Sequence, residues 1–413
     1  MLTFNITYVI IGQQDIFTQT KEADVMFRKM LLCLSAIILC FGCSREQETE
    51  ERADADREQE IAEESIKLAN GYQDIYDASL REDDEEILGM QQKIIDCVGK
   101  SGYAAVDDAD QTDMINYAQV ETFCEHAAQG QKGEVTIISV TSDGGFLRYD
   151  METQDGEIEV ALTTLSWENS EPKVVYYHEF TAHSWEYTEK GYLFIQEYQP
   201  EGYDGAPGEI AFRVKPLDEK CRELNRKYVY PLGYERNNLL VADWDEADYS
   251  ELELYDLYER FYWIKYGESV PYEAYNGAEY EIPEEKFEEV LQSYLTIDSG
   301  QIREKTVYDR ERHTYRYRPR GMGESEFSYG PYPEVVGYEE QEDGTLRLFV
   351  EAVWERKMTD RGVLSELVVR PFDDGSFQYV SNHVVSWDEN LEFKWYFPRL
   401  TDEEWTKRWD DIL

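Results

Sequence analysis

The chain has 413 residues and a formal net charge of −48, because 88 acidic residues face only 40 Lys and Arg. This balance argues strongly against nucleic-acid binding, which needs basic surface to meet phosphate. Hydrophobic residues make up 42% and aromatic residues 14% of the chain, so it is expected to fold rather than remain disordered. The acidity favours solubility outside the cell, and attraction for cations or basic partners is the alternative.

Residues 26–42 have the composition of a secretion signal. Arg28 and Lys29 precede an apolar run over 31–41, which has the length of a signal core. A membrane-spanning helix needs about 20 apolar residues, so this run is too short to cross a bilayer. Gly42 and Cys43 follow, and the pattern predicts a lipoprotein signal peptide with lipidation at Cys43. An ordinary secretion signal is the alternative.

The segments on either side fit this interpretation. Residues 1–25 carry no positive start, and we interpret them as a mis-assigned translation start or a dispensable extension. Residues 43–60 are rich in Glu, Asp, Arg and Gln, which predicts an acidic, solvated tether. The expected location is therefore the extracellular face of the cytoplasmic membrane, with membrane contact only through the N-terminal lipid.

Residues 61–130 show helical periodicity. The stripe from Ile87 to Val98 is one-sided and ends at Gly99. Cys97 flanks this stripe and Cys124 lies on the next one, so two antiparallel helices could join them as a disulfide. Two buried free thiols are the alternative. With Cys221, the predicted mature chain has three cysteines after Cys43, so at least one stays unpaired within the chain.

The remaining chain alternates between strands and helices. Residues 135–198 have period-2 patterns and D-G or K-G turns, which predict an antiparallel meander. Residues 245–267 and the segment after Pro283 predict a helical pair. Residues 335–387 predict a second antiparallel sheet, and a capping box at Thr401 and Glu404 begins a short C-terminal helix. The predicted class is α+β, with modules over 61–245 and 246–413.

Several segments carry a family resemblance: Pro216–Asn225, Tyr230–Tyr234, Asp243–Asp245, Pro331–Val336, Val369–Pro371 and Gly375–Asn382. Together they are similar to an uncharacterised lipoprotein family of Gram-positive anaerobic bacteria, over most of residues 60–390. The resemblance implies a cell-envelope lipoprotein. It brings no known activity, cofactor or functional residue.

The motifs that suggest chemistry fail in their spacing. His178 and His183 are five residues apart in a strand-like segment, whereas the zinc protease motif needs a separation of four on a helix. The acidic runs 243–248 and 108–113 lack the Gly and Glu of a calcium loop. No nucleophile elbow or P-loop is present. We therefore predict no catalytic residue, metal or cofactor.

Aromatic residues offer the best candidate binding surface. Most of six tryptophans lie inside strand or helix patterns, where core packing is favoured over a binding surface: Trp167, Trp185, Trp244, Trp263, Trp354 and Trp387. The loop tyrosines predicted to be exposed are Tyr272, Tyr275, Tyr280, Tyr329 and Tyr332. The arginine-rich stretch 308–320 could dock an acidic group, although pairing with the protein's own carboxylates is favoured.

Three functions follow. The favoured one is a non-catalytic surface lipoprotein that binds an envelope protein or glycan. The first alternative is a cell-wall or polysaccharide hydrolase with an unrecognised carboxylate site, although 88 acidic residues single out no pair. The second is a transporter's solute-binding lipoprotein, which the block-like order of helices and strands disfavours.

Overall fold

The structure is a computed structural model that describes residues 55–80, 87–108, 111–203, 208–275, 277–320, 330–387, 396 and 398–409. The chain forms two compact units, Met1–Leu68 and Ala69–Leu413. In the first unit, residues 55–68 are helical. The last residues of the predicted tether, 55–60, belong to this helix, and most of them have good helix propensity. Cys43, the signal segment and residues 1–25 lie outside the described residues.

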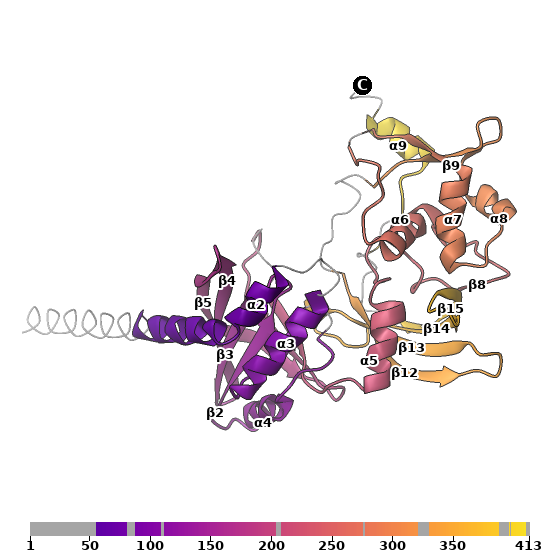
Figure 1. Cartoon of the computed structure of the whole chain (residues 1–413). Coiled ribbons are helices and arrows are strands. Elements are labelled where there is room, and N and C mark those ends of the chain that lie inside the picture. Colours follow the sequence, from indigo (N-terminus) through magenta and orange to yellow (C-terminus); the bar gives the residue numbers. More distant parts are fainter. Residues whose placement is uncertain are drawn as a thin grey trace, which may run out of the picture. The chain divides into compact units, whose positions relative to one another are not determined.

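The second unit begins with helices (Figure 1). They are α2 (Gln73–Ser79), α3 (Ile87–Lys100) and α4 (Tyr117–Ala128). The predicted stripe from Ile87 to Val98 is confirmed as helix α3. Between α3 and α4 lies a strand that helical periodicity did not predict, β1 (Ala104–Asp107), whose four residues are all buried. A fully buried strand lacks the polar alternation that would distinguish it from a helix segment.

A seven-stranded sheet follows, with strands in sequence order. Its other strands are β2 (Gly133–Val140), β3 (Phe146–Gln154), β4 (Glu157–Glu168), β5 (Glu171–Tyr187), β6 (Tyr192–Glu197) and β7 (Glu209–Arg213). β1 pairs with β2 in parallel, and every later pair is antiparallel. Gly144 and Gly156 have φ of 80° and 88° in two of the turns, where glycine avoids the strain of a left-handed backbone.

The first core lies between this sheet and α4. Val120, Phe123 and Ala127 of α4 are buried in the same cluster as Ile137 of β2 and Met151 of β3. The cluster runs along the chain from Ala104 to Val214.

The second half of the unit mixes short helices with two smaller sheets. Its helices are α5 (Glu219–Leu224), the π-helix η2 (Asn225–Val229), α6 (Leu254–Tyr266), α7 (Glu284–Tyr294), α8 (Ser299–Lys305), the 3-10 helix η4 (Glu355–Lys357) and α9 (Asp402–Trp409). One sheet has the order β10 (Tyr308–Asp309), β11 (Thr314–Tyr317), β9 (Tyr280–Pro283). The other has the order β12 (Tyr332–Glu340), β13 (Leu346–Val353), β14 (Val363–Pro371), β15 (Phe377–Trp387), β8 (Trp244–Asp245).

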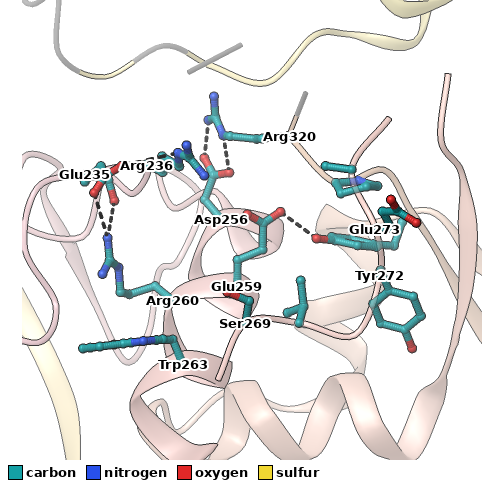
Figure 2. A pocket seen from close by; sticks show the side chains of 14 residues that line it. Glu235, Arg236, Asp256, Glu259, Arg260, Trp263, Ser269, Tyr272, Glu273 and Arg320 are labelled. Atoms are coloured by element: carbon teal, nitrogen blue, oxygen red, sulfur yellow. Dashed lines mark hydrogen bonds and ion pairs between the residues drawn. The ribbon is translucent and has the colours of Figure 1, made fainter. Parts of the chain in front are cut away.

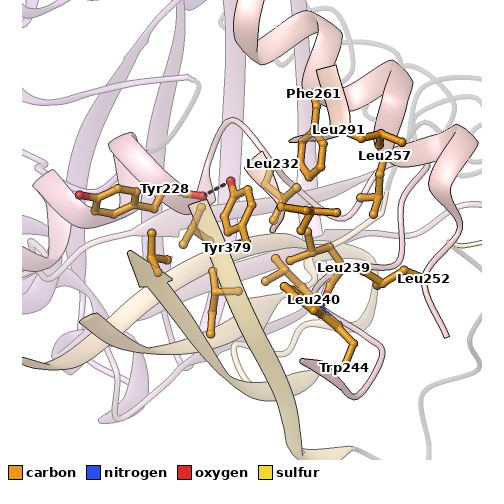
Figure 3. Packing of buried hydrophobic residues seen from close by; sticks show 14 of the residues in the cluster. Tyr228, Leu232, Leu239, Leu240, Trp244, Leu252, Leu257, Phe261, Leu291 and Tyr379 are labelled. Atoms are coloured by element: carbon orange, nitrogen blue, oxygen red, sulfur yellow. Dashed lines mark hydrogen bonds between the residues drawn. The ribbon is translucent and has the colours of Figure 1, made fainter. Parts of the chain in front are cut away.

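A second core joins these elements (Figure 3). Leu257 and Phe261 of α6, Leu291 of α7 and Tyr379 of β15 pack together, and the Tyr379 hydroxyl donates to the Tyr228 carbonyl oxygen at 2.7 Å. This cluster begins at Leu217. Along the chain, the residues of the first core therefore end at Val214 and those of the second begin at Leu217.

Buried ionic contacts connect the two cores. Glu334 of β12 accepts from Arg213 Nε at 2.9 Å and from the Tyr192 hydroxyl at 2.5 Å. Lys190 Nζ lies 3.1 Å from Glu334 and 2.8 Å from Glu351. Separating the two sheets here would leave buried charges without their partners, which is energetically costly. The network therefore helps to hold the sheets together.

The predicted α+β class is confirmed: the structure has N-terminal helices, a long antiparallel-rich sheet, further sheets and a short C-terminal helix. The capping box is also present, since Glu404 accepts from the Thr401 backbone N–H at 2.9 Å and donates its own N–H to the Thr401 hydroxyl at 3.3 Å. Within the described ranges, no helix has the length and apolarity needed to cross a membrane.

Candidate functional site

A cavity of about 450 Å³ lies beside helix α6 (Figure 2). This volume is within the range of about 300–1,000 Å³ that small-molecule sites occupy. The α6 cavity is lined by segments that are distant in sequence: Glu235, Arg236, Asp256, Glu259, Arg260, Trp263, Ser269, Val270, Tyr272, Glu273, Ala274, Tyr317, Pro319 and Arg320.

Helix α6 supplies the wall because it has two different faces. Glu253 caps its N-terminus by accepting from the Tyr255 N–H at 3.3 Å, and Gly267 ends it at φ 71°. Leu254, Leu257 and Phe261 point into the second core. The lining residues of α6 follow a helical spacing of i, i+3, i+4 and i+7: Asp256, Glu259, Arg260 and Trp263. Residues at this spacing share one face of a helix.

Asp256 forms the floor of the cavity and is fully buried. Arg320 Nε donates to its Oδ1 at 2.8 Å and Arg320 Nη2 to its Oδ2 at 2.5 Å. Arg399 Nε donates to Oδ1 at 2.6 Å, and the Tyr396 hydroxyl donates to Oδ2 at 3.1 Å. Both carboxylate oxygens are therefore engaged by the protein, so Asp256 holds the floor together and does not reach a ligand.

Glu259 continues this buried network one helical turn later. Its Oε1 accepts from the Tyr317 hydroxyl at 2.7 Å and from Arg399 Nη2. Burial alone would lower the pKa of Arg399, but Asp256 and Glu259 hold that pKa well above its ordinary value. Burial also raises the pKa of Tyr317 above its ordinary value, and Glu259 adds to the effect. Tyr317 therefore remains a neutral donor at physiological pH.

The rim on one side carries a mixed ionic group and an exposed ring. Arg260 Nη2 donates to the Glu235 carbonyl oxygen at 3.0 Å and lies 4.0 Å from its carboxylate. Arg236 Nε lies 3.5 Å from the same carboxylate. Burial lowers the pKa of Arg260, and Glu235 opposes that shift. Trp263 is 44% exposed, and the Arg260 guanidinium carbon lies 5.9 Å from its ring centroid.

The loop after α6 forms another part of the lining. Ser269, Tyr272 and Glu273 contribute polar groups. The Tyr280 hydroxyl donates to the Glu273 carbonyl oxygen at 2.9 Å, and its ring lies 5.2 Å from that of Tyr272. In Figure 2, Trp263 and Tyr272 lie at two ends of the view, with Glu259 and Ser269 between them. The cavity therefore combines aromatic surface with short polar side chains.

The structure places the predicted tyrosines in two different regions. Tyr272 lines the cavity, Tyr275 is exposed, and both lie near Tyr280. Tyr332 was predicted on an exposed loop, which is wrong. It begins strand β12 opposite Val353 and packs against the cluster of Tyr192 and Phe194, with its hydroxyl buried. Tyr329 lies outside the described residues.

The tryptophan prediction is right for some positions and wrong for the most informative one. Trp244 and Trp354 are buried, as expected. Trp263 was expected in the core but is exposed at the cavity rim. The signal was present in the sequence, because position 263 lies about 180° around the helix from Leu254. Trp387 has no described side chain.

The arginine-rich stretch 308–320 pairs with the protein's own carboxylates, which was the interpretation favoured over docking of an acidic group. Arg316 and Arg318 each contact Asp402 of α9 at 2.6 Å, and Arg320 contacts Asp256. Arg312 pairs with Glu281. The stretch is therefore used to attach the C-terminal segment to β11 and α6.

The predicted disulfide is not present in the structure. Within the described residues, Cys97, Cys124 and Cys221 are free. Cys97 of α3 is half-buried and its sulfur lies 3.7 Å from the Gly71 carbonyl oxygen, whereas Cys124 of α4 is packed into the first core. The two cysteines thus occupy different environments.

The two histidines of the rejected zinc motif have separate partners. His178 Nε2 lies 2.7 Å from Glu197, and the ring of His183 lies 5.6 Å from that of Tyr198. In the part of the chain that the structure describes, no group of three or more His, Cys, Asp or Glu side chains is placed to hold a metal.

Comparison with known proteins gives a family without an assigned role. Residues 58–399 match a family of unknown function, DUF6070. The chain belongs to the DUF6070 family. No curated protein and no solved structure matches this DUF6070 chain. The matched range includes every segment that lines the α6 cavity.

The two acidic residues at the floor of this DUF6070 site are not placed for acid–base chemistry. General acid and base groups must reach the reacting atoms of a bound substrate. The two acidic residues at the floor, Asp256 and Glu259, are instead engaged by arginine and tyrosine donors. The α6 cavity thus offers a fixed floor and a rim whose groups can contact a ligand.

Proposed function

We propose that this DUF6070 protein is a lipid-anchored bacterial surface protein that binds a small polar ligand, without catalysis, in the α6 cavity. The observation that carries the proposal is the exposed Trp263 at the rim of a cavity with a rigid ionic floor. Binding sites of this kind place a few fixed polar groups beside aromatic surface. The residue pattern that ends at Cys43 supports attachment by lipid outside the cell.

The hydrolase alternative gains no support from the cavity. Glycosidases need one carboxyl group that donates a proton and a second that acts as nucleophile or base. Asp256 already has four hydrogen bonds from Arg320, Arg399 and Tyr396. The solute-binding alternative gains no support either. Such proteins are usually built from alternating strands and helices, whereas the large sheet is antiparallel except for the pair of β1 and β2.

Binding is tested on the full-length protein purified in detergent from a Gram-positive host. Ligand-observed NMR would screen neutral sugars, amino acids, short peptides, polyamines, nucleosides and phosphates. We expect at least one class of ligand to bind the wild type and to lose binding in Trp263→Ala. Tyr203→Ala is the control and should bind like the wild type, because Tyr203 is exposed but does not line the cavity. A panel in which no class depends on Trp263 would refute the proposed site.

Anchoring is tested separately by comparing the wild type with Cys43→Ser. We expect the wild type in the membrane fraction with a lipid-modified Cys43 at its N-terminus, as measured by intact mass, and the variant in the medium. A wild-type protein that is soluble in the medium would contradict the anchor but leave the cavity proposal intact.

A further inference from the structure

We infer that the α6 cavity takes a neutral saccharide, stacked on Trp263 and hydrogen-bonded by the loop after α6. This inference deepens the proposed function and rests on it, because it names the ligand class of the same cavity. Three properties of the lining carry it: its charge balance, the exposed Trp263 and the polar side chains of the loop after α6.

The charges of the lining other than that of Glu273 are compensated within the protein. Glu235 lies beside Arg236 and Arg260. Asp256 pairs with Arg320, and Glu259 pairs with Arg399, which approaches from the C-terminal segment. An anionic or strongly cationic ligand would have to compete with one of these existing pairs, some of them buried. A neutral ligand makes no such demand.

Trp263 provides a flat apolar surface at the rim. Trp263 is 44% exposed, although the other side of α6 is packed into the second core. The face of an aromatic ring carries partial negative charge. A pyranose presents one face of weakly positive C–H groups, so it complements the ring without bringing a formal charge.

The position of Arg260 disfavours a cationic ligand on this ring. Its guanidinium carbon lies 5.9 Å from the Trp263 ring centroid, within the distance of a cation–π contact. A ligand ammonium on the ring would therefore be close to an existing positive charge. The uncharged C–H face of a sugar avoids this repulsion.

The loop groups suit hydroxyl partners. Ser269, Tyr272 and Glu273 are among the residues that line the cavity, and their side chains carry two hydroxyls and a carboxylate. A hydroxyl both donates and accepts, and a carboxylate accepts. Sugar hydroxyls can satisfy all three, which a purely apolar ligand cannot. Aromatic stacking with hydrogen bonding around the edge of the ring is the mode expected for a saccharide.

The experiment titrates full-length protein with chitotriose, cellotriose and maltotriose by calorimetry and ligand-observed NMR. We expect at least one trisaccharide to bind, Trp263→Ala to weaken it at least about tenfold, and Trp263→Phe to restore part of the loss. Tyr203→Ala is the matched control for loss of an exposed aromatic side chain. Equal urea midpoints of the tryptophan and tyrosine variants would show that folding is unchanged.

The outcomes separate the two proposals. Trp263-dependent binding of peptides, polyamines or phosphates, with none of the trisaccharides bound at millimolar concentrations, overturns the saccharide inference but preserves the binding function. A trisaccharide that binds wild type and Trp263→Ala equally overturns the placement of the sugar on this ring. No Trp263-dependent ligand in any class overturns both.

Discussion

The buried floor of the α6 cavity makes a quantitative prediction about stability. Asp256→Asn removes a negative charge from a fully buried site while keeping the side-chain shape. Arg320, whose side chain is 2% exposed, then loses its ion pair with Asp256, and Arg399 loses the same charge but keeps Glu259. Breaking a buried pair on one side costs about 3–5 kcal/mol. Since Arg399 keeps its ion pair with Glu259, we expect the lower end of this range, a fall in the free energy of unfolding of about 3 kcal/mol.

Asp402→Asn is the matched control because Asp402 also pairs with two arginines. Its side chain is 65% exposed, and Arg316 and Arg318 each lie 2.6 Å from its oxygens. Exposed pairs contribute about 0–1 kcal/mol and are weakened by salt. Hydrogen bonding from Arg316 lowers the pKa of Asp402, so this small contribution exists above the unfolded-state pKa and is lost as pH falls through the folded-state pKa.

The measurement is urea unfolding at neutral pH, in low and high salt, followed by tryptophan fluorescence. Trp244 and Trp354 are buried in the second core and report its transition. We expect the midpoint of Asp256→Asn to fall far more than that of Asp402→Asn, with an unchanged dependence on urea concentration. High salt should erase only the effect at Asp402. Equal midpoints for the two variants would refute the assignment of Asp256 as a buried ionic centre.

Two further predictions concern buried titratable groups. Burial raises the pKa of Cys124 to about 12. Alkylation of the native protein at pH 8, followed by peptide mass spectrometry, should therefore label Cys97 first and Cys124 only after unfolding. If neither cysteine is labelled unless a reductant is added, the two form a disulfide and the expectation is wrong. Burial, with Glu209 nearby, raises the pKa of Glu355 from 4.5 to about 7. The folded state then holds this proton more tightly, so the contribution of Glu355 to stability falls as pH rises from about 4.5 to 7 and does not change above about pH 7. Glu355→Gln should therefore have a higher melting temperature than wild type at pH 8 and an equal one at pH 4. A higher melting temperature of the variant at both pH values would contradict a cause in the ionisation of Glu355.

Local periodicity explains which parts of the fold could be predicted. The α3 stripe and the β2–β3 hairpin depend on residues close in sequence, and Gly144 marks the turn of the hairpin. The parallel pairing of β1 with β2 could not be predicted in this way, because α4 separates the two strands in sequence. The addition of β8 to the edge of β15 likewise joins residues far apart in the chain.

The candidate site was only partly accessible for the same reason. The polar stripe of α6 is visible from spacing alone, and it places Trp263 opposite the core face. Grouping Trp263 with tryptophans for which core packing was favoured obscured this signal. The role of Arg399 could not be predicted, because it reaches Asp256 from a segment about 140 residues later in the chain. Without that contact, Asp256 resembles any other acidic residue on a helix.

The internal use of arginine also connects the composition to the proposed ligand. The chain is strongly acidic, and Arg316, Arg318, Arg320 and Arg399 are directed at the protein's own carboxylates. The long-range field is therefore expected to repel anions and to attract basic partners, with an attraction that salt weakens. A neutral saccharide is not steered by this field, so its affinity for the α6 cavity should be nearly independent of ionic strength. A basic peptide bound in the same cavity would instead lose affinity as salt rises, which gives a second way to distinguish the two ligand classes.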